Sequence, residues 1–265
     1  MAALDAGRAV RAIRRRAHLP SRRRATATTP ATTDVALPPP EERAGSLTPQ
    51  QVRFFETFGF LVVPGLLADD IDRIEQGFED VFASNERMET YERLHFESRR
   101  MTIPAFVRKS PLLEGLPTDP RVTGIVTSLL GEHFVDVESD GNIFSCETSW
   151  HPDTYAAPLA DHHVKVSLYL DPLTGENGAV RMMPGTNHWR GSYALALRRE
   201  LDDPGDIRAR FGVDPRDLPG HTIHSVPGDV VVWDFRTVHA SFHGGERRRL
   251  LSLNFKQLPG PAPTA

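Results

Sequence analysis

Apolar positions recur every three to four residues in three segments of the chain, which is the spacing of a helix with one buried face. The first segment follows Thr48, which we expect to cap a helix, with Gln51 completing a capping box and Gly59 ending the helix. A second helix is expected to begin at Asp69, and a third to occupy residues 119–131. We expect these helices to support a sheet.

The pattern changes from residue 134 onward to an alternation of apolar and polar positions, which indicates strands. The expected strands are 60–63, 134–138, 142–149, 164–170, 178–183, 221–226, 229–235 and 248–256. A run of helices followed by a run of strands is typical of an α+β, mainly β domain, such as a helix-backed barrel or jelly roll. Residues 191–220 are polar and rich in turn formers, so they are expected to form a lid or binding loop.

Two terminal segments lack a sustained hydrophobic period. Residues 1–45 are rich in Arg, Ala, Thr and Pro and are expected to form a disordered tail, and residues 259–265 a flexible one. An organelle transit peptide, a bacterial leader, a start codon placed too early and a nucleic-acid-binding arm all stay open for the first tail. The folded domain is expected to span residues 46–258.

Charge excludes one large class of function. Residues 1–33 hold eight arginines and one acidic residue, which leaves 23 basic against 34 acidic residues in the rest of the chain. A body with this balance is not expected to bind nucleic acid. The single cysteine, Cys146, excludes an intrachain disulfide, and no apolar run is long enough to span a membrane. We therefore expect a cytoplasmic protein without a membrane partner.

Candidate metal ligands occur in two separate motifs. His151 and Asp153 lie two positions apart in Trp-His-Pro-Asp, so on an extended segment both side chains leave the same face. His239 lies at the far end of the strand that begins after the turn at Pro227–Gly228, and is a candidate third ligand. Two imidazoles and one carboxylate are typical of non-haem Fe(II) oxygenases, although the same set can also hold zinc.

An arginine follows the last candidate ligand at the start of another strand. Arg248 shares one side of that strand with Ser252, whereas Arg249 points away. A guanidinium directed into a barrel suits a bidentate clamp on a dicarboxylic cosubstrate. Lys165 and Ser167 alternate on an earlier strand, where they either contact a cosubstrate or substrate or, for the lysine, face solvent.

Several other positions keep two interpretations. The alternating Asn142, Phe144 and Cys146 either pack in the core or line a pocket. Arg181 is either a pocket cation or an exposed side chain. The adjacent histidines 162–163 point in opposite directions on an extended chain, which favours a loop role over metal ligation.

Taken in order, these motifs resemble the phytanoyl-CoA dioxygenase family of Fe(II)- and 2-oxoglutarate-dependent oxygenases over nearly all of residues 46–258. The resemblance includes Leu-Thr-Pro-Gln-Gln-Val-Arg-Phe-Phe, Trp-His-Pro-Asp, Leu-Tyr-Leu-Asp, Glu-Asn-Gly-Ala-Val-Arg-Met-Met-Pro-Gly-Thr and Gly-Asp-Val-Val-Val-Trp-Asp. Two positions depart from the family pattern: Pro152 replaces a frequent glutamine, and Asn187 interrupts Pro-Gly-Ser-His. Neither removes a candidate ligand.

The resemblance implies a double-stranded β-helix, a cupin-like jelly-roll barrel with iron inside. It implies that His151, Asp153 and His239 hold Fe(II) and that Arg248 binds the distal carboxylate of 2-oxoglutarate. O2 would be the second cosubstrate, and ascorbate a suitable reductant in vitro. Related halogenases have glycine or alanine at the carboxylate position, so the presence of Asp153 favours oxygenation over halogenation.

The reaction implied by the resemblance is hydroxylation of an unactivated C–H bond of a small molecule, with release of succinate and CO2. A secondary metabolite or small acid is the expected substrate, selected by residues 84–117 and 191–220. Desaturation or ring formation by the same cofactors stays open. The alternative from another class is a non-catalytic, metal-binding cupin-like protein. The sequence does not decide the oligomeric state.

Overall fold

The computed structural model describes residues 44–84, 89–93, 98–153, 162–201, 207–244 and 247–260. The expected tail over residues 1–45 therefore lies outside the described residues apart from its last two positions, as do residues 261–265 of the second tail. The first described helix is α1 (Pro49–Phe58). Thr48 and Gln51 form the capping box, and Gly59 ends the helix in the left-handed conformation at φ 85°, as the sequence predicts.

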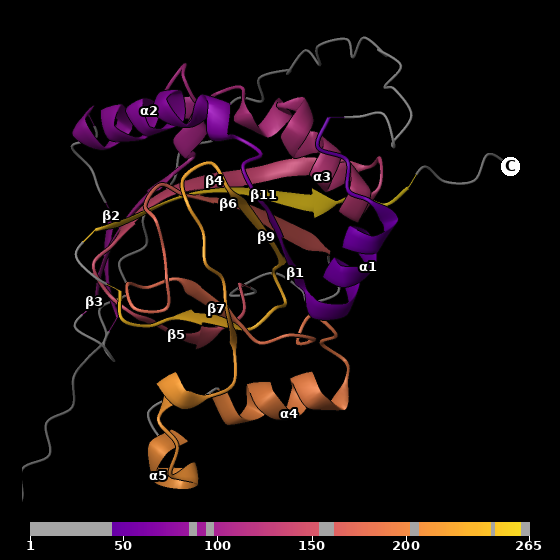
Figure 1. Ribbon diagram of the computed structural model, residues 1–265, viewed down its shortest axis with the longest axis vertical. Coiled ribbons are helices and arrows are strands. Elements are labelled where there is room, and N and C mark those ends of the chain that lie inside the picture. Colours follow the sequence, from indigo (N-terminus) through magenta and orange to yellow (C-terminus); the bar gives the residue numbers. More distant parts are fainter. Residues whose placement is uncertain are drawn as a thin grey trace, which may run out of the picture. The chain divides into compact units, whose positions relative to one another are not determined.

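Two antiparallel sheets form the centre of the molecule (Figure 1). The larger sheet has the order β1 (Phe60–Val63), β9 (Val230–Asp234), β6 (His163–Tyr169), β11 (Arg248–Gln257), β4 (Phe134–Phe144), β3 (Ser98–Pro104), β2 (Glu89–Arg93). The smaller sheet has the order β5 (Thr148–His151), β10 (His239–Ser241), β7 (Val180–Met182), β8 (His221–Thr222). This is the mainly β, α+β fold that the sequence predicts, with the chain passing between two facing sheets.

Helices lie beyond both sheets, as Figure 1 shows. The outer face of the larger sheet is covered by α2 (Ile71–Ser84) and α3 (Pro120–Leu130), and the smaller sheet is followed by α4 (Ser192–Leu201) and α5 (Ile207–Phe211). Short 3-10 segments occupy Ala68–Asp70, Phe106–Lys109, Leu116–Thr118 and Pro215–Asp217. No helix in the described part of the chain is long and apolar enough to cross a membrane.

The alternation of side chains on the central strands separates the core into layers. On β6, Val164, Val166 and Leu168 pack against the helices, whereas Tyr169 faces the smaller sheet. Trp233 of β9 likewise faces the smaller sheet. A third cluster lies between the smaller sheet and the α4–α5 region. The space between the two sheets therefore contains an apolar cluster of its own, which includes Tyr169 and Trp233.

The structure corrects three expectations about the elements. Residues 134–144 form one continuous strand, so the expected break at 139–141 is wrong, and the expected strand 142–149 is divided between β4 and β5 of different sheets. His239 does not end the strand of residues 230–234 but begins β10 after a turn. The described part of residues 191–220, the segment expected to form a lid or binding loop, contains α4 and α5. The hairpin of β2 and β3 was not predicted, because its sequence lacks a clear apolar alternation.

Candidate metal and cosubstrate site

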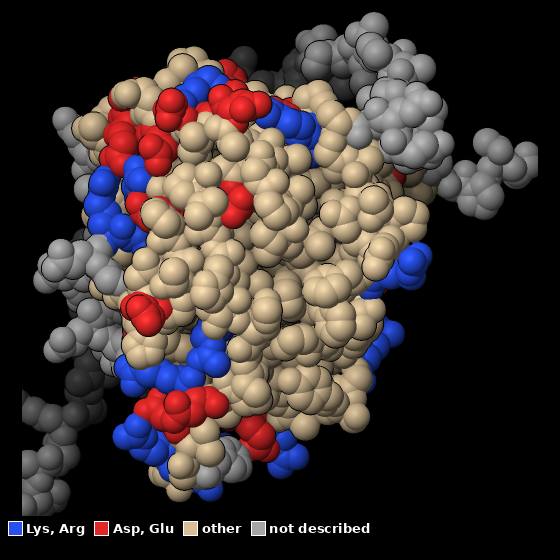
Figure 2. All heavy atoms as spheres, in the orientation of Figure 1, with Lys and Arg blue, Asp and Glu red and all other residues tan. Residues whose placement is uncertain are grey.

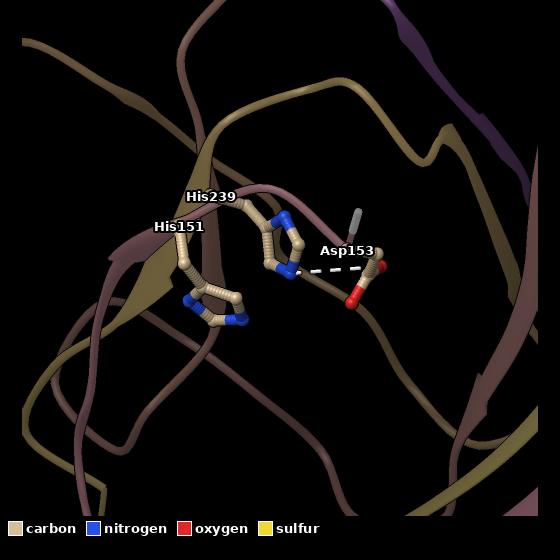
Figure 3. Close-up of side chains that lie close together, drawn as sticks. All are labelled: His151, Asp153 and His239. Carbon is tan, nitrogen blue, oxygen red and sulfur yellow. Dashed lines mark ion pairs between the residues drawn. The ribbon is translucent and has the colours of Figure 1, made fainter. Parts of the chain in front are cut away.

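Cross-strand pairing brings the candidate ligands together. In the smaller sheet His151 of β5 is the direct antiparallel partner of His239 of β10, and their ring centroids lie 4.5 Å apart. Asp153 follows β5 by two residues, and its backbone N–H donates a 2.8 Å hydrogen bond to the carbonyl of Phe235. One ligand atom from each of the three side chains lies within 4.8 Å of the others (Figure 3). The structure therefore assembles a compact His-Asp-His group.

Backbone carbonyls orient both imidazoles. The Nδ1 atom of His151 lies 2.6 Å from the carbonyl oxygen of Ser149, and Nδ1 of His239 lies 2.9 Å from that of Thr237. A carbonyl accepts only, so each Nδ1 carries the proton and donates it. Each Nε2 is then left with a lone pair, which is the form in which imidazole binds a metal.

Asp153 receives two donors on one oxygen. Nε1 of Trp233 donates a 2.8 Å hydrogen bond to Oδ2, and the ammonium of Lys165 lies 3.0 Å from the same atom. Burial raises the pKa of Asp153, but the nearby positive charge of Lys165 opposes it most strongly, and the pKa is held well below its usual range. Because two donors occupy the lone pairs of Oδ2, Oδ1 is the oxygen with lone pairs left for a metal.

Burial also keeps the second imidazole neutral. The side chain of His239 is almost fully enclosed, and desolvation lowers its pKa although Asp153 acts in the opposite direction. A neutral His239 and an ionised Asp153, together with the Nε2 lone pair of His151, give the donor set expected for a divalent cation.

Arg248 lies between the two sheets at the opposite end of β11 from Asn254. It is 4% exposed, and its Nη1 donates to the carbonyl of Gly178 at 2.6 Å and to Oγ of Ser241 at 2.5 Å. Burial lowers the pKa of Arg248, yet a guanidinium stays protonated in proteins. Among the described residues no carboxylate lies within salt-bridge distance of it. A buried cation without an acidic partner is suited to hold an anion.

Gly178 provides the room for this arginine. Its φ is 101°, and a Cβ atom built on it would lie 2.2 Å from Nη1 of Arg248. The glycine of Glu-Asn-Gly-Ala is therefore required both by the backbone conformation and by the close approach of the guanidinium.

The remaining candidate residues divide between the site and the surface. Ser167 is fully buried, and its Oγ has no hydrogen-bond partner in the part of the chain that the structure describes. The ammonium of Lys165, the other residue expected to contact a cosubstrate or substrate, lies beside Asp153. Arg181 points outward from the smaller sheet and donates to the carbonyl of Leu218 at 2.8 Å, so it is not a pocket cation. His162 pairs with Asp234 at 3.1 Å, outside the ligand group.

Polar contacts around Asn142 were not predicted. Arg100 of β3 donates from Nε and Nη2 to Oδ1 of Asn142 at 2.9 and 2.8 Å, and Thr102 donates to the same atom at 2.8 Å. The guanidinium carbons of Arg100 and Arg248 each lie 5.0 Å from the ring centroid of Phe144. Asn142 and Phe144 therefore belong to the lining of the interior. Cys146 packs in the apolar cluster between the sheets.

Comparisons with known proteins agree with this geometry. The chain matches the family described as phytanoyl-CoA dioxygenase over residues 55–249. No curated protein matches it. The solved structures that resemble it include SnoK, a non-heme alpha ketoglutarate dependent carbocyclase from nogalamycin biosynthesis, with 22% identity, a TM-score of 0.63 and coverage of 82% of this chain and 85% of that one.

Two further structures have the same fold. The epimerase SnoN from nogalamycin biosynthesis is 19% identical, with a TM-score of 0.64 and coverage of 78% and 80% of the two chains. HygX from Streptomyces hygroscopicus, solved with nickel and 2-oxoglutarate bound, is 18% identical, with a TM-score of 0.62 and coverage of 80% and 88%. The family match spans most of the chain and contains all the residues of the His-Asp-His group. The chain belongs to the phytanoyl-CoA dioxygenase family, and is thus a member of the Fe(II)- and 2-oxoglutarate-dependent oxygenases.

Proposed function

We propose that this protein hydroxylates a C–H bond of a small molecule, using Fe(II), 2-oxoglutarate and O2. The observation that carries the proposal is the group formed by His151, Asp153 and His239, which presents two imidazoles and one ionised carboxylate. Three protein ligands on one face of an ion leave positions for cosubstrates. A binding protein without turnover requires neither those positions nor a buried cation such as Arg248.

Three side chains of the group hold the metal, and two others orient the carboxylate. His151 and His239 would hold the ion through Nε2 and Asp153 through its carboxylate, while Trp233 and Lys165 fix the position of Oδ2. The bound iron supplies the oxidising chemistry that the side chains lack, coupled to decarboxylation of 2-oxoglutarate to succinate.

The cosubstrate is bound by two other buried side chains, Arg248 and Ser167. Arg248 pairs with the distal carboxylate of 2-oxoglutarate, and the Oγ of Ser167 donates a hydrogen bond to the same molecule. Support for this assignment is that the Ser167 hydroxyl has no partner among the described residues. Both side chains are buried, so the carboxylate is bound away from bulk water. Ionic hydrogen bonds are stronger in such an interior than they are in water. The Oγ atom of Ser241 accepts a hydrogen bond from Nη1 of Arg248 and so fixes the direction of the guanidinium.

Related structures support a small-molecule substrate. SnoN has been solved with Fe3+, alpha ketoglutarate and nogalamycin RO, and HygX with nickel, 2-oxoglutarate and hygromycin B. Both ligands are small molecules, and we propose the same broad class for this protein, with residues 84–117 and 191–220 selecting among them.

The test begins with cofactor binding. Purified protein with Fe(II) and 2-oxoglutarate under anaerobic conditions should show a weak metal-to-ligand absorption band, and with O2 and ascorbate it should release succinate slowly without substrate. A protein that shows no band and no calorimetric binding of either cofactor would refute the oxygenase function.

Product mass then identifies the reaction. Hydroxylation adds one oxygen atom, desaturation or ring formation removes two hydrogens, and epimerisation leaves the mass unchanged. The distinction matters because the related structures include a carbocyclase and an epimerase. A product heavier by one oxygen atom supports hydroxylation. A loss of two hydrogens would show desaturation or ring formation instead, and an unchanged mass would show epimerisation.

A further inference from the structure

A polar row crosses the larger sheet beside the metal ligands. Glu138 of β4 pairs with Asn254 of β11, which pairs with Lys165 of β6. Directly paired residues project from the same face of a sheet. Since the ammonium of Lys165 reaches Asp153, Glu138 and Asn254 also lie on the face that borders the site.

A second row places another carboxylate on the same face. Asp140 of β4 pairs with Ser252, and Ser252 pairs with Ser167. The Nδ2 atom of Asn254 donates a 3.2 Å hydrogen bond to Oδ2 of Asp140, which connects the two rows. Glu138, which is exposed, and Asp140, which is half-buried, are therefore neighbours on one wall of the space beside the site. Partial desolvation, followed by the charge of Asp140, raises the pKa of Glu138.

Asn254 gives an independent indication of a ligand. Its side chain is 8% exposed, and its Oδ1 is buried with no hydrogen-bond partner among the described residues. A buried carbonyl oxygen without a donor is costly, by roughly 1–3 kcal/mol. Asn254 is paired with Glu138 on one side and with Lys165 on the other, and no described donor contacts its Oδ1.

Neither Glu138 nor Asp140 forms an ion pair within the described part of the chain. Two lysines project from the same face, Lys165, which contacts Asp153 at 3.0 Å, and Lys256, which pairs with His163 farther along β6. Neighbouring strands lie about 4.8 Å apart, so Glu138 is roughly 10 Å from Lys165 across the sheet. A sugar ring or a short chain is long enough to reach from one to the other.

We propose that the substrate carries a cationic amine, which Glu138 and Asp140 bind while Oδ1 of Asn254 accepts one of its N–H groups. This inference rests on the proposed function and specifies the substrate class of the same site. It replaces the small acid expected from the sequence, since two carboxylates on the wall would repel an anionic substrate.

The test uses the full chain loaded with Co(II), an O2-stable substitute for Fe(II), and with 2-oxoglutarate. The probes are 1,4-diaminobutane, spermidine and glucosamine, each beside its N-acetyl derivative, with succinamate as an anionic probe. Relaxation of probe protons by the paramagnetic ion reports both the affinity and the proximity to the metal. Loading is measured first by calorimetry, so a failure of the proposed function is distinguished from a failure of the substrate class.

The expected result is a preference of about tenfold or more for at least one amine over its acetylated form, with relaxation that depends on Co(II). Glu138→Gln combined with Asp140→Asn should abolish the preference while Co(II) and 2-oxoglutarate still bind. Asp136→Asn is the control, because Asp136 pairs with Phe255, which packs toward the helices. Equal binding or no binding of every amine pair, preference for succinamate, or a preference that survives the double substitution would overturn the proposal.

Discussion

Lys165 Nζ lies 3.0 Å from Oδ2 of Asp153, so a lysine from the larger sheet neutralises a metal ligand that follows a strand of the smaller one. The side chains are only 14% and 8% exposed. The same oxygen also accepts the indole N–H of Trp233. The larger sheet therefore sets the orientation of a carboxylate whose backbone belongs to the smaller sheet.

Substitution of Lys165 by methionine should affect the metal-free protein more than the metal-bound one. Without metal, Lys165→Met leaves a buried carboxylate with one fewer donor, and unfolding free energy should fall by about 1–3 kcal/mol. A bound divalent cation replaces the lost charge, so affinity for Co(II) should rise. Thermal unfolding with and without Co(II), together with calorimetry, measures both quantities. A variant that loses Co(II) affinity would show that Lys165 acts mainly by positioning Asp153.

Asp153 is the ligand whose loss should end the reaction. Asp153→Gly removes the only anionic ligand of the group, and we expect metal affinity to fall by at least about tenfold and hydroxylation to be abolished. Succinate release and calorimetric metal binding measure the effect, and circular dichroism checks that the variant is folded. Full hydroxylase activity in this variant would remove Asp153 from the ligand set.

Arg248 should control the affinity for 2-oxoglutarate. Arg248→Lys retains the charge but cannot form the bidentate pair, so KM for 2-oxoglutarate should rise about tenfold or more. The control is Arg247→Lys, because Arg247 is largely exposed and pairs with Glu79 on the surface. Initial rates of succinate release across a 2-oxoglutarate titration test this, and an unchanged KM in Arg248→Lys would assign the clamp elsewhere.

Low pH should reduce the stability that Asp119 contributes at the N-terminus of α3. The hydrogen bond from the Arg121 side chain lowers the pKa of Asp119, and burial opposes it without reversing the shift. A lowered folded-state pKa means that the unfolded chain binds the proton first, so the stabilisation is present above about pH 5 and is lost as pH falls through the folded pKa. Asp119→Asn keeps a helix-capping side chain without the charge.

The expected difference between wild type and Asp119→Asn is about 1 kcal/mol at pH 7 and close to zero near pH 2. Urea unfolding at a series of pH values measures it. A difference that stays constant across the series would show that ionisation of Asp119 does not contribute to stability.

The family, the class of fold and the layers of the core follow from local features of the sequence. The capping box at Thr48, the alternation of β6, and the spacing of His151 and Asp153 each depend on residues close together in the chain. The face of Arg248 follows from the period of two on its strand. Short-range periodicity is sufficient for these features, because the geometry of one helix or strand determines which side chains share a face.

The tertiary structure alone decided which faces meet. His239 lies beside His151 because β10 joins the smaller sheet after a turn, a change of sheet that no local period encodes. The same is true of Lys165 and Asp153, of the outward direction of Arg181 and of the row from Glu138 to Lys165. Strand order and register between distant segments depend on the packing of the whole core. The sequence by itself therefore determined the ligands and their chemical class, whereas the fold decided their surroundings and the charge of the wall beside them.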